Sequence, residues 1–131
     1  MKIKSIKARP ELDSRGEWTI EVRLKLKNGI ESITSVPQGK SRGSSEAVYV
    51  SPKIAIRNIE KIISPALNGI HTGNQNFIDH CLLKLDGTKN KSRLGANATL
   101  GVSVAAAKAA ALSQNIPLWK HLAHLLEYKR T

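Results

Sequence analysis

The chain contains very little cysteine and few aromatic residues. Cys81 is the single cysteine among 131 residues, so no disulfide bond can form within the chain. This cysteine usage predicts a reducing, cytoplasmic location. Two Trp, two Tyr and one Phe are the only aromatic residues. The core must therefore be built mainly from aliphatic side chains and alanine.

Long apolar runs are also missing. The first ten residues, MKIKSIKARP, lack the apolar segment of a secretory signal, and no later run approaches membrane-spanning length. We therefore expect a soluble intracellular protein without a membrane partner. No repeat, linker or low-complexity tail interrupts the sequence, and its length is usual for one domain. The prediction is a single domain over residues 1–131.

Acidic residues are scarce relative to basic ones. Twenty-one Lys and Arg oppose ten Asp and Glu, which gives a formal net charge of +11. Such a charge attracts polyanions at low salt. The basic residues are spread from Lys2 to Arg130, so two interpretations stay open. The surface either is solvated and meets an acidic protein partner, or it binds nucleic acid or another polyanion.

Strand signals occupy the first third of the chain. Residues 2–9 predict a strand that Pro10 ends, and strict alternation over residues 19–27 predicts a second strand with one buried face. Asn28-Gly29 then predicts a two-residue type I′ hairpin turn, followed by a strand over residues 30–36. Three strands with such short links predict an antiparallel meander.

Helix signals follow the strands. Ser51-Pro52 is a favourable start for a helix, and Pro65 is expected to interrupt that helix. A second helix is expected over residues 75–83. An alanine-rich helix should then end near Asn115, and Pro117 opens a last helix. The predicted fold class is α+β, a three-stranded antiparallel β-meander followed by about four helices. Residues expected to pack inward are Trp18, Phe77, Ile78, Cys81, Leu82 and Trp119.

The histidines offer weaker candidates for a site. His121 and His124 lie three positions apart on a predicted helix, so they share a face that could bind a metal ion or pack in the core. His80-Cys81 could form a nucleophilic pair, although a core cysteine is the simpler interpretation.

One stretch carries a specific pattern. Residues 83–111 read LKLDGTKNKSRLGANATLGVSVAAAKAAA, a turn and a basic loop that lead into small residues. This stretch resembles the end of the enolase N-terminal domain, with its LDGTxNKSxLGANAxLGVSxAxAKAAA pattern. The segments over residues 8–16, 36–43 and 59–69 are similar to the same family in the same order. The family fold implied by the resemblance is a three-stranded meander followed by four helices.

The resemblance also implies a functional loop. In enolases the loop that matches residues 36–43 closes over the active site, and its later serine, here Ser41, helps bind the second magnesium ion. Lys40 and Arg42 depart from the family pattern, and two added cations would repel a metal but attract a phosphate. Together with Ser44 and Ser45 at a helix start, they are candidates for an anion-binding loop.

The resemblance implies that the catalytic residues of the family lie in another part of the chain. In enolases the lysine base, the partner glutamates and the main metal-binding carboxylates lie on a C-terminal barrel, and this sequence stops at Thr131 before that barrel. The chain alone is expected to be noncatalytic and to need no cofactor, with magnesium reaching Ser41 only beside a barrel partner. Candidate residues for docking to a barrel or for self-association are Arg9, Arg15 and Glu21.

Three functions therefore compete. The chain could be a capping or docking subunit for an enolase barrel in 2-phosphoglycerate dehydration, a step of glycolysis. It could be a basic binding module on an inherited fold, for nucleic acid or another polyanion. It could also be a fragment or the product of a decayed gene. The substitutions at Lys40 and Arg42 favour a diverged, noncatalytic enolase-like domain.

Overall fold

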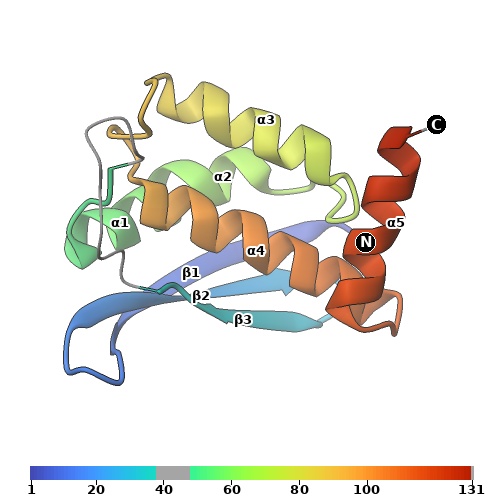
Figure 1. Ribbon diagram of the computed structural model, residues 1–131, viewed down its shortest axis with the longest axis horizontal. Coiled ribbons are helices and arrows are strands. Elements are labelled where there is room, and N and C mark those ends of the chain that lie inside the picture. Colours follow the sequence, from blue (N-terminus) through green and yellow to red (C-terminus); the bar gives the residue numbers. More distant parts are fainter. Residues whose placement is uncertain (38–47, 131) are drawn as a thin grey trace.

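The computed structural model describes residues 1–37 and 48–130, with side chains described as far as residue 127. It begins with three strands, β1 (Ile3–Leu12), β2 (Trp18–Leu26) and β3 (Glu31–Ser35). They form one antiparallel sheet in the order β1-β2-β3. Helices cover one face of this sheet (Figure 1). The predicted β-meander is confirmed.

The central strand β2 builds the floor of the core. Its alternate residues Ile20, Val22, Leu24 and Leu26 are fully buried beneath the helices. The period of two in the sequence therefore gives the predicted buried face, because successive side chains of a strand point to opposite sides.

The prediction that Pro10 ends the first strand is wrong. β1 continues to Leu12, and Pro10 pairs with Ile20 in the register. The N–H groups of Ile6 and Ala8 point away from the sheet, toward Ser64 Oγ at 2.9 Å and Glu60 Oε2 at 3.2 Å. By alternation the nitrogen of Pro10 also faces this open edge, where a missing donor costs no ladder hydrogen bond.

The turn between β2 and β3 also differs from the prediction. Leu26 N donates to Ile30 O at 2.8 Å, so the loop has three residues rather than two. Gly29 has φ +94°, whereas Asn28 is absent from the described residues with positive φ. A type I′ turn needs positive φ at both central residues, so that prediction is wrong. A three-residue loop that ends in a left-handed glycine takes its place.

The helices follow in four segments, which agrees with the prediction. Their bounds are α1 Pro52–Asn58, η1 Ile59–Ile63, α2 Ser64–Leu67, α3 Gln75–Asp86, α4 Ala96–Ser113 and α5 Leu118–Arg130. The first three run without a break and count as one segment. In Figure 1 the α1–α2 segment and α4 lie over the sheet, α3 lies beyond them, and α5 lies at the far end of α4.

Pro65 lies inside the first helical segment and does not interrupt it, contrary to the prediction. Residues 59–63 form a π-helical turn, in which Ser64 N–H donates to Ile59 O, five residues back. A proline in a regular α-helix clashes with the carbonyl group four residues earlier. The wider turn directly before Pro65 relieves this crowding and lets the helix run on to Leu67.

The long helix α4 lies directly on the sheet because Gly101 has no side chain. A Cβ atom at Gly101 would lie 2.7 Å from Cγ2 of Val22 and 2.9 Å from Cγ2 of Val36. The alanine-rich sequence of α4 thus brings helix and sheet backbones close together, as the run of small residues predicts.

The aromatic side chains depart furthest from the predicted core. Trp18 is 56% exposed, Phe77 47% and Trp119 70%, so these three predictions of packing are wrong. Ile78 and Leu82 are buried as predicted, and Cys81 is half-buried. The core is aliphatic because isoleucine, leucine, valine and alanine fill the space between sheet and helices. None of the helices in the described ranges combines the length and apolar character needed to cross a membrane.

Candidate functional site

The predicted loop site falls mostly outside the described residues. Lys40, Ser41, Arg42, Ser44 and Ser45 all lie there, so the metal and anion roles assigned to them stay predictions. The described residues on either side show how the two ends of this loop are held.

The first end is fixed to the sheet. Val36 N donates to Ile20 O at 3.0 Å, and the Thr19 hydroxyl donates to Val36 O at 2.6 Å. Both contacts are buried, so the chain leaves the sheet edge from a defined position.

The second end is fixed to the start of α4 by Asn97. Its side-chain amide accepts from Val50 N at 3.2 Å and donates to Val50 O at 2.9 Å, as a neighbouring strand would. Ala96 N also donates to Val48 O at 2.8 Å. A Cβ atom on Gly95 would lie 2.4 Å from Cγ2 of Val50, so only glycine fits. This role of Asn97 was not predicted from the sequence, because Val50 lies 47 residues away along the chain.

The basic loop before α4 is organised by Asp86. This buried carboxylate accepts hydrogen bonds from Leu94 N at 2.7 Å, from Thr88 N at 2.9 Å and from the Thr88 hydroxyl group. Burial raises the pKa of Asp86, but these hydrogen bonds outweigh it and hold the pKa below its ordinary value. The carboxylate therefore holds the turn after α3 and the start of α4 together.

Arg9 and Glu21, predicted as docking residues, contact each other within the chain. Arg9 Nε lies 2.9 Å from Glu21 Oε1, and Arg23 Nε lies 2.8 Å from the same atom. The Glu21 side chain is only 8% exposed, whereas that of Arg9 is 61% exposed. The hydrogen bonds from Arg23 and then Arg9 lower the pKa of Glu21. The arginines thus present positive charge on the outer face of the sheet, and docking there stays a prediction.

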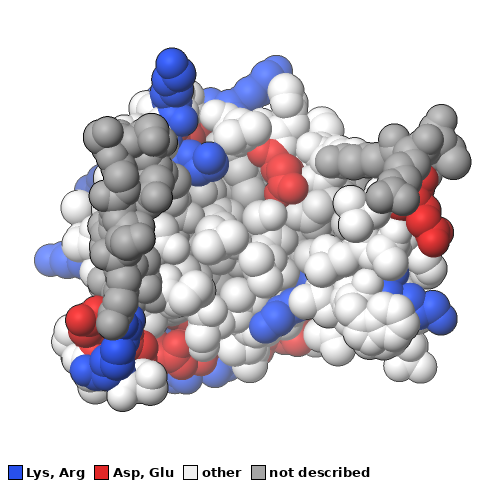
Figure 2. All heavy atoms as spheres, viewed as in Figure 1, with Lys and Arg blue, Asp and Glu red and all other residues white. Residues whose placement is uncertain are grey.

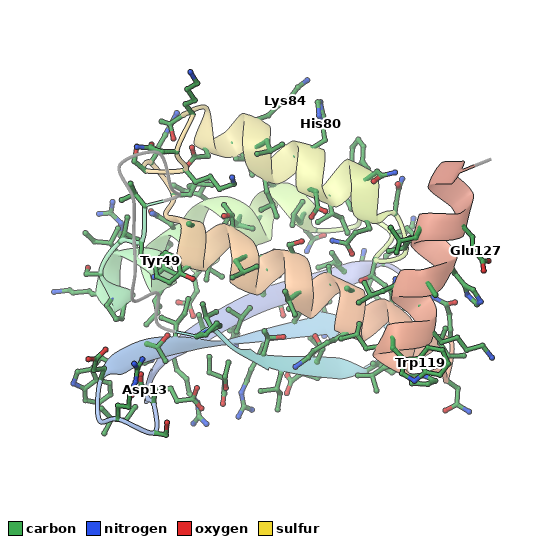
Figure 3. All side chains as sticks on the ribbon, in the orientation of Figure 1. Asp13, Tyr49, His80, Lys84, Trp119 and Glu127 are labelled. Carbon is green, nitrogen blue, oxygen red and sulfur yellow. The ribbon has the colours of Figure 1, made fainter. Side chains whose placement is uncertain are left out.

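Arg15, the third predicted docking residue, lies in the turn between β1 and β2. Its guanidinium group is 3.5 Å from Asp13 Oδ2, while the backbone N–H groups of Arg15 and Glu17 each donate to Asp13 Oδ1 at 2.9 Å. The hydrogen bond from Glu17 is the main cause that lowers the pKa of Asp13. Figure 3 places Asp13 at this hairpin, at one end of the sheet. Its contacts order the turn.

A groove runs along the side of α4 that faces away from the sheet. The part between α3 and α4 has a volume of about 520 Å³, and a hollow of about 210 Å³ next to it reaches α5. Both are lined by Asp79 and Ser103. Leucines line both parts, and Tyr49 and Lys91 also line the larger one; the leucines are Leu82, Leu83, Leu100, Leu118 and Leu122.

Polar side chains at the middle of the groove form a small network. Asp79 Oδ1 accepts from the Ser103 hydroxyl at 2.7 Å and from Gln75 Nε2 at 3.0 Å. Gln75 Nε2 also lies 3.2 Å from Ser103 O, so three residues from α3 and α4 share one set of contacts. No Lys or Arg of the described ranges forms an ion pair with Asp79.

The histidine pair lies where α5 meets the end of α4. His121 is only 4% exposed, which agrees with the packing alternative, whereas His124 is exposed. Gln114 Nε2 donates to Ala110 O at 3.1 Å and lies 3.2 Å from His121 Nδ1, whereas His121 Nε2 is buried with no hydrogen-bond partner among the described residues. Burial, and then the neighbouring His124, lower the pKa of His121. Residues 1–37 and 48–127 contain no group of three His, Cys, Asp or Glu placed to hold a metal ion.

Comparison with known proteins agrees with the observed fold of three strands followed by helices. A family model described as "Enolase, N-terminal domain" matches residues 3–122. The enolase of Methanopyrus kandleri is 46% identical over 131 positions, that of Anaplasma phagocytophilum is 45% identical over 132, and enolase 1 of Methylococcus capsulatus is 44% identical over 132. Each alignment covers 92% of this chain but 31% of the relative. The chain therefore spans about a third of the length of these relatives.

Proposed function

The chain belongs to the enolase family as its N-terminal domain, and from this premise we propose that it serves 2-phosphoglycerate dehydration by capping an enolase barrel. The match over residues 3–122 carries the proposal, since it covers the strands, the helices and the start of α5. The barrel would supply the base and the metal-binding carboxylates. The chain would supply the loop over the active site and the surface that holds this loop in place.

The anchoring contacts around the loop support a capping role. Val36 is tied to β2, and Val50 is tied to Asn97 on α4. A loop whose two ends are fixed can be placed reproducibly over a partner's active site, which lowers the entropy lost when the site closes. Lys40 and Arg42 would then bring positive charge toward the phosphate group of the substrate.

Magnesium belongs mainly to the barrel in this proposal. The resemblance assigns one residue of this chain to the metal, Ser41, which lies outside the described residues. The described ranges hold no group of three metal-ligating side chains that would fit the ion. The chemistry that depends on magnesium is therefore assigned to carboxylates of the barrel.

A chimeric enzyme tests the proposal. Residues 3–122 would replace the matching segment of the Methanopyrus kandleri enolase, and dehydration of 2-phosphoglycerate would be followed through the ultraviolet absorbance of the product. We expect the chimera to be active and the chain alone to be inactive. A folded chimera without activity, or an active chain alone, would contradict the proposal. Ser41→Ala should lower the activity of the chimera, whereas Ser92→Ala, at an exposed serine, should leave it unchanged.

A second candidate function is the binding of nucleic acid or another polyanion. The net charge of +11 is the observation that favours it. Attraction of this kind depends strongly on salt, so the salt dependence of binding separates a physiological ligand from nonspecific attraction.

A further inference from the structure

A polar hollow of about 570 Å³ lies between the start of α3 and the helix α5. Gln75 and Asn76 line it from α3, and His121 and His124 line it from α5, which lies beside the start of α3 in Figure 1. Figure 2 shows mostly uncharged residues across the middle of the helix-covered face, with Lys and Arg toward its margins. Of the described residues that line the hollow, none is Lys, Arg, Asp or Glu. Its chemistry therefore comes from amides, imidazole rings and backbone N–H groups.

Two buried polar atoms of the lining residues have no hydrogen-bond partner among the described residues. They are Nε2 of His121 and Oε1 of Gln75. His121 is only 4% exposed, and its other ring nitrogen, Nδ1, already lies 3.2 Å from Gln114 Nε2. Leaving a buried polar group unpaired costs free energy, so nearly all such groups are paired with protein, water or a ligand. The two atoms thus call for a partner that the described residues do not supply.

The orientation of the Gln75 amide is fixed by its neighbours. Its Nε2 donates to Asp79 Oδ1 at 3.0 Å and lies 3.1 Å from Ser103 Oγ. Exchanging nitrogen and oxygen would place Oε1 against the carboxylate, which is unfavourable. Asp79 and Ser103 line the neighbouring hollow of about 210 Å³, whereas Gln75 lines both hollows. Nε2 therefore faces the smaller hollow, and Oε1 remains as an acceptor on the side of the larger one.

The start of α3 adds backbone N–H groups to the same hollow. The helix has 12 residues, and its first hydrogen bond runs from Ile78 N to Asn74 O at 3.0 Å. The N–H groups of residues 75–77 precede this bond, and within the described structure the Asn74 side chain does not cap them. The first turn also contains no Asp or Glu that would offset the positive end of the helix dipole. Such N–H groups favour a negatively charged ligand.

We propose that this hollow binds a small oxyanion that also carries an O–H group, such as hydrogen phosphate or a hydroxycarboxylate. The N–H groups at the start of α3 would hold the anionic oxygens. His121 would donate to the anion through Nε2, with Nδ1 accepting from Gln114. The O–H group of the ligand would donate to Gln75 Oε1. This site is independent of the proposed capping function, because none of its residues belongs to the loop over residues 38–47.

The acceptor on Gln75 predicts a selectivity between anions. At neutral pH phosphate carries a proton on at least one oxygen, whereas sulfate carries none. Sulfate would therefore set an oxygen lone pair against Oε1 and leave this buried acceptor unpaired, and a site built to bond an O–H group rejects an analogue that lacks it. We expect phosphate to bind about tenfold or more tightly than sulfate, and lactate to exceed propionate by a similar factor.

Nuclear magnetic resonance tests the proposal on the full chain. Phosphate, sulfate, lactate and propionate would each be titrated at neutral pH in roughly 150 mM chloride, which screens general attraction to the net charge. The signals followed are the backbone N–H groups of residues 75–77 and the ring of His121. We expect saturable shifts of these signals with phosphate or lactate. Comparison of phosphate with lactate then identifies which source of the oxyanion the hollow prefers.

Each other outcome would overturn the proposal. Unsaturated shifts of equal size with phosphate and sulfate would show an adventitious ion only. Saturable binding of equal affinity within both pairs of anions would contradict the need for an O–H group. Unchanged signals at residues 75–77 and His121 would exclude the site. Shifts confined to residues 38–47 would instead place the anion in the loop that the sequence predicts to bind one.

A matched pair of variants separates the site from the general charge. Asn76→Asp places a carboxylate in the first turn of α3, where it favours the helix but repels an anion in the hollow. Asn28→Asp changes the net charge equally in the turn between β2 and β3 and keeps the Oδ1 acceptor for Ile30 N. We expect phosphate affinity to fall by about tenfold or more in Asn76→Asp and by less than about twofold in Asn28→Asp. Equal losses would assign the binding to net charge and overturn the proposal.

Gln75→Met tests the acceptor itself. Methionine has a similar length but offers no oxygen, so neither anion then has to supply a donor. The preference for phosphate over sulfate should fall to less than about threefold. Gln75 also contacts Asp79, so the urea midpoint is measured in parallel, and Asn76→Asp tests the site without breaking that contact. A tenfold preference that persists in folded Gln75→Met would overturn the role of Oε1.

Discussion

At the scale of single residues, buried polar side chains carry the local order around the candidate loop. Asp86 is the clearest case, since one carboxylate accepts from two backbone N–H groups and one hydroxyl group. The neutral amide of Asn97 instead accepts from Val50 N and donates to Val50 O. Asp86 ties the turn after α3 to the start of α4, and Asn97 ties Val50 to the same helix, so these two residues position the segments that lead into α4.

We expect Asp86→Asn to lower the free energy of unfolding by about 2 kcal/mol at neutral pH, because charged hydrogen bonds are lost and an N–H donor faces other donors. Urea denaturation measures this, with the exposed Glu17→Gln as control. The pKa of Asp86 is lowered in the folded state, so its contribution is present above the ordinary value of about 3.9 and lost as pH falls through the folded pKa. The difference between the two proteins should narrow in acid, and a constant difference would contradict this account.

His121 should also make the free energy of unfolding depend on pH, in a window that begins at about pH 6.5 and so lies at higher pH than the onset of the Asp86 window. Burial lowers its pKa in the folded state, so below about pH 6.5 the unfolded chain binds the proton more readily. Stability should therefore fall as pH drops from 6.5 through the folded pKa. Protonation would also place an N–H on Nδ1, against the amide group of Gln114.

Denaturation by urea across this range, in the wild type and in His121→Phe, checks the expectation. In His121→Phe the urea midpoint should fall less as the pH is lowered. In His80→Gln, a change at an exposed histidine, the midpoint should fall as much as in the wild type. The same slope in all three proteins would assign the pH dependence to other groups.

At the scale of elements, the packing of α4 on the sheet depends on the absence of one side chain. Gly101→Ala would improve helix propensity by about 1 kcal/mol but would force a methyl group against Val22 and Val36. Overpacking of this kind costs about 1–3 kcal/mol, and both valines are buried and stiff. We expect a net loss of up to about 2 kcal/mol in the free energy of unfolding, measured by urea denaturation.

A double-mutant cycle isolates this clash. Val22→Ala should itself destabilise the chain, but Gly101→Ala should then cost much less, since the nearest methyl group is gone. Leu100→Ala, on the open side of the same helix, serves as a control for general effects on α4. Equal costs of Gly101→Ala in both backgrounds would show that the close approach to Val22 does not limit this position.

The elements also show what local sequence patterns can predict. The alternation along β2 and the Ser51-Pro52 helix start were recovered, because a period of two and an N-cap act within a few residues. The effects of Pro10 and Pro65 were predicted wrongly. Whether a proline ends an element depends on an open sheet edge or a preceding π-helical turn, which the proline itself does not encode.

At the scale of the whole molecule, the fold class was predictable and the open side of α4 was not. Strands followed by helices, together with the pattern over residues 83–111, led to the observed α+β fold. The composition of α4 indicated a buried helix, but only the structure shows which side stays open. Similarly, the sequence suggested Arg9 and Glu21 as docking residues without showing that they pair with each other.

The net charge of +11 predicts how the chain binds DNA, and the salt dependence of this binding separates the two proposed functions. At low salt we expect the chain to bind duplex DNA of any sequence, because a charge of +11 releases condensed counterions from the phosphate backbone. If about six phosphates are contacted, affinity should fall by about a thousandfold between roughly 50 and 200 mM salt. Fluorescence anisotropy with two unrelated duplexes measures this, and Lys7→Glu with Lys25→Glu should reduce the salt slope. Binding that survives physiological salt and prefers one duplex would instead favour a nucleic-acid function, since nonspecific attraction provides neither property.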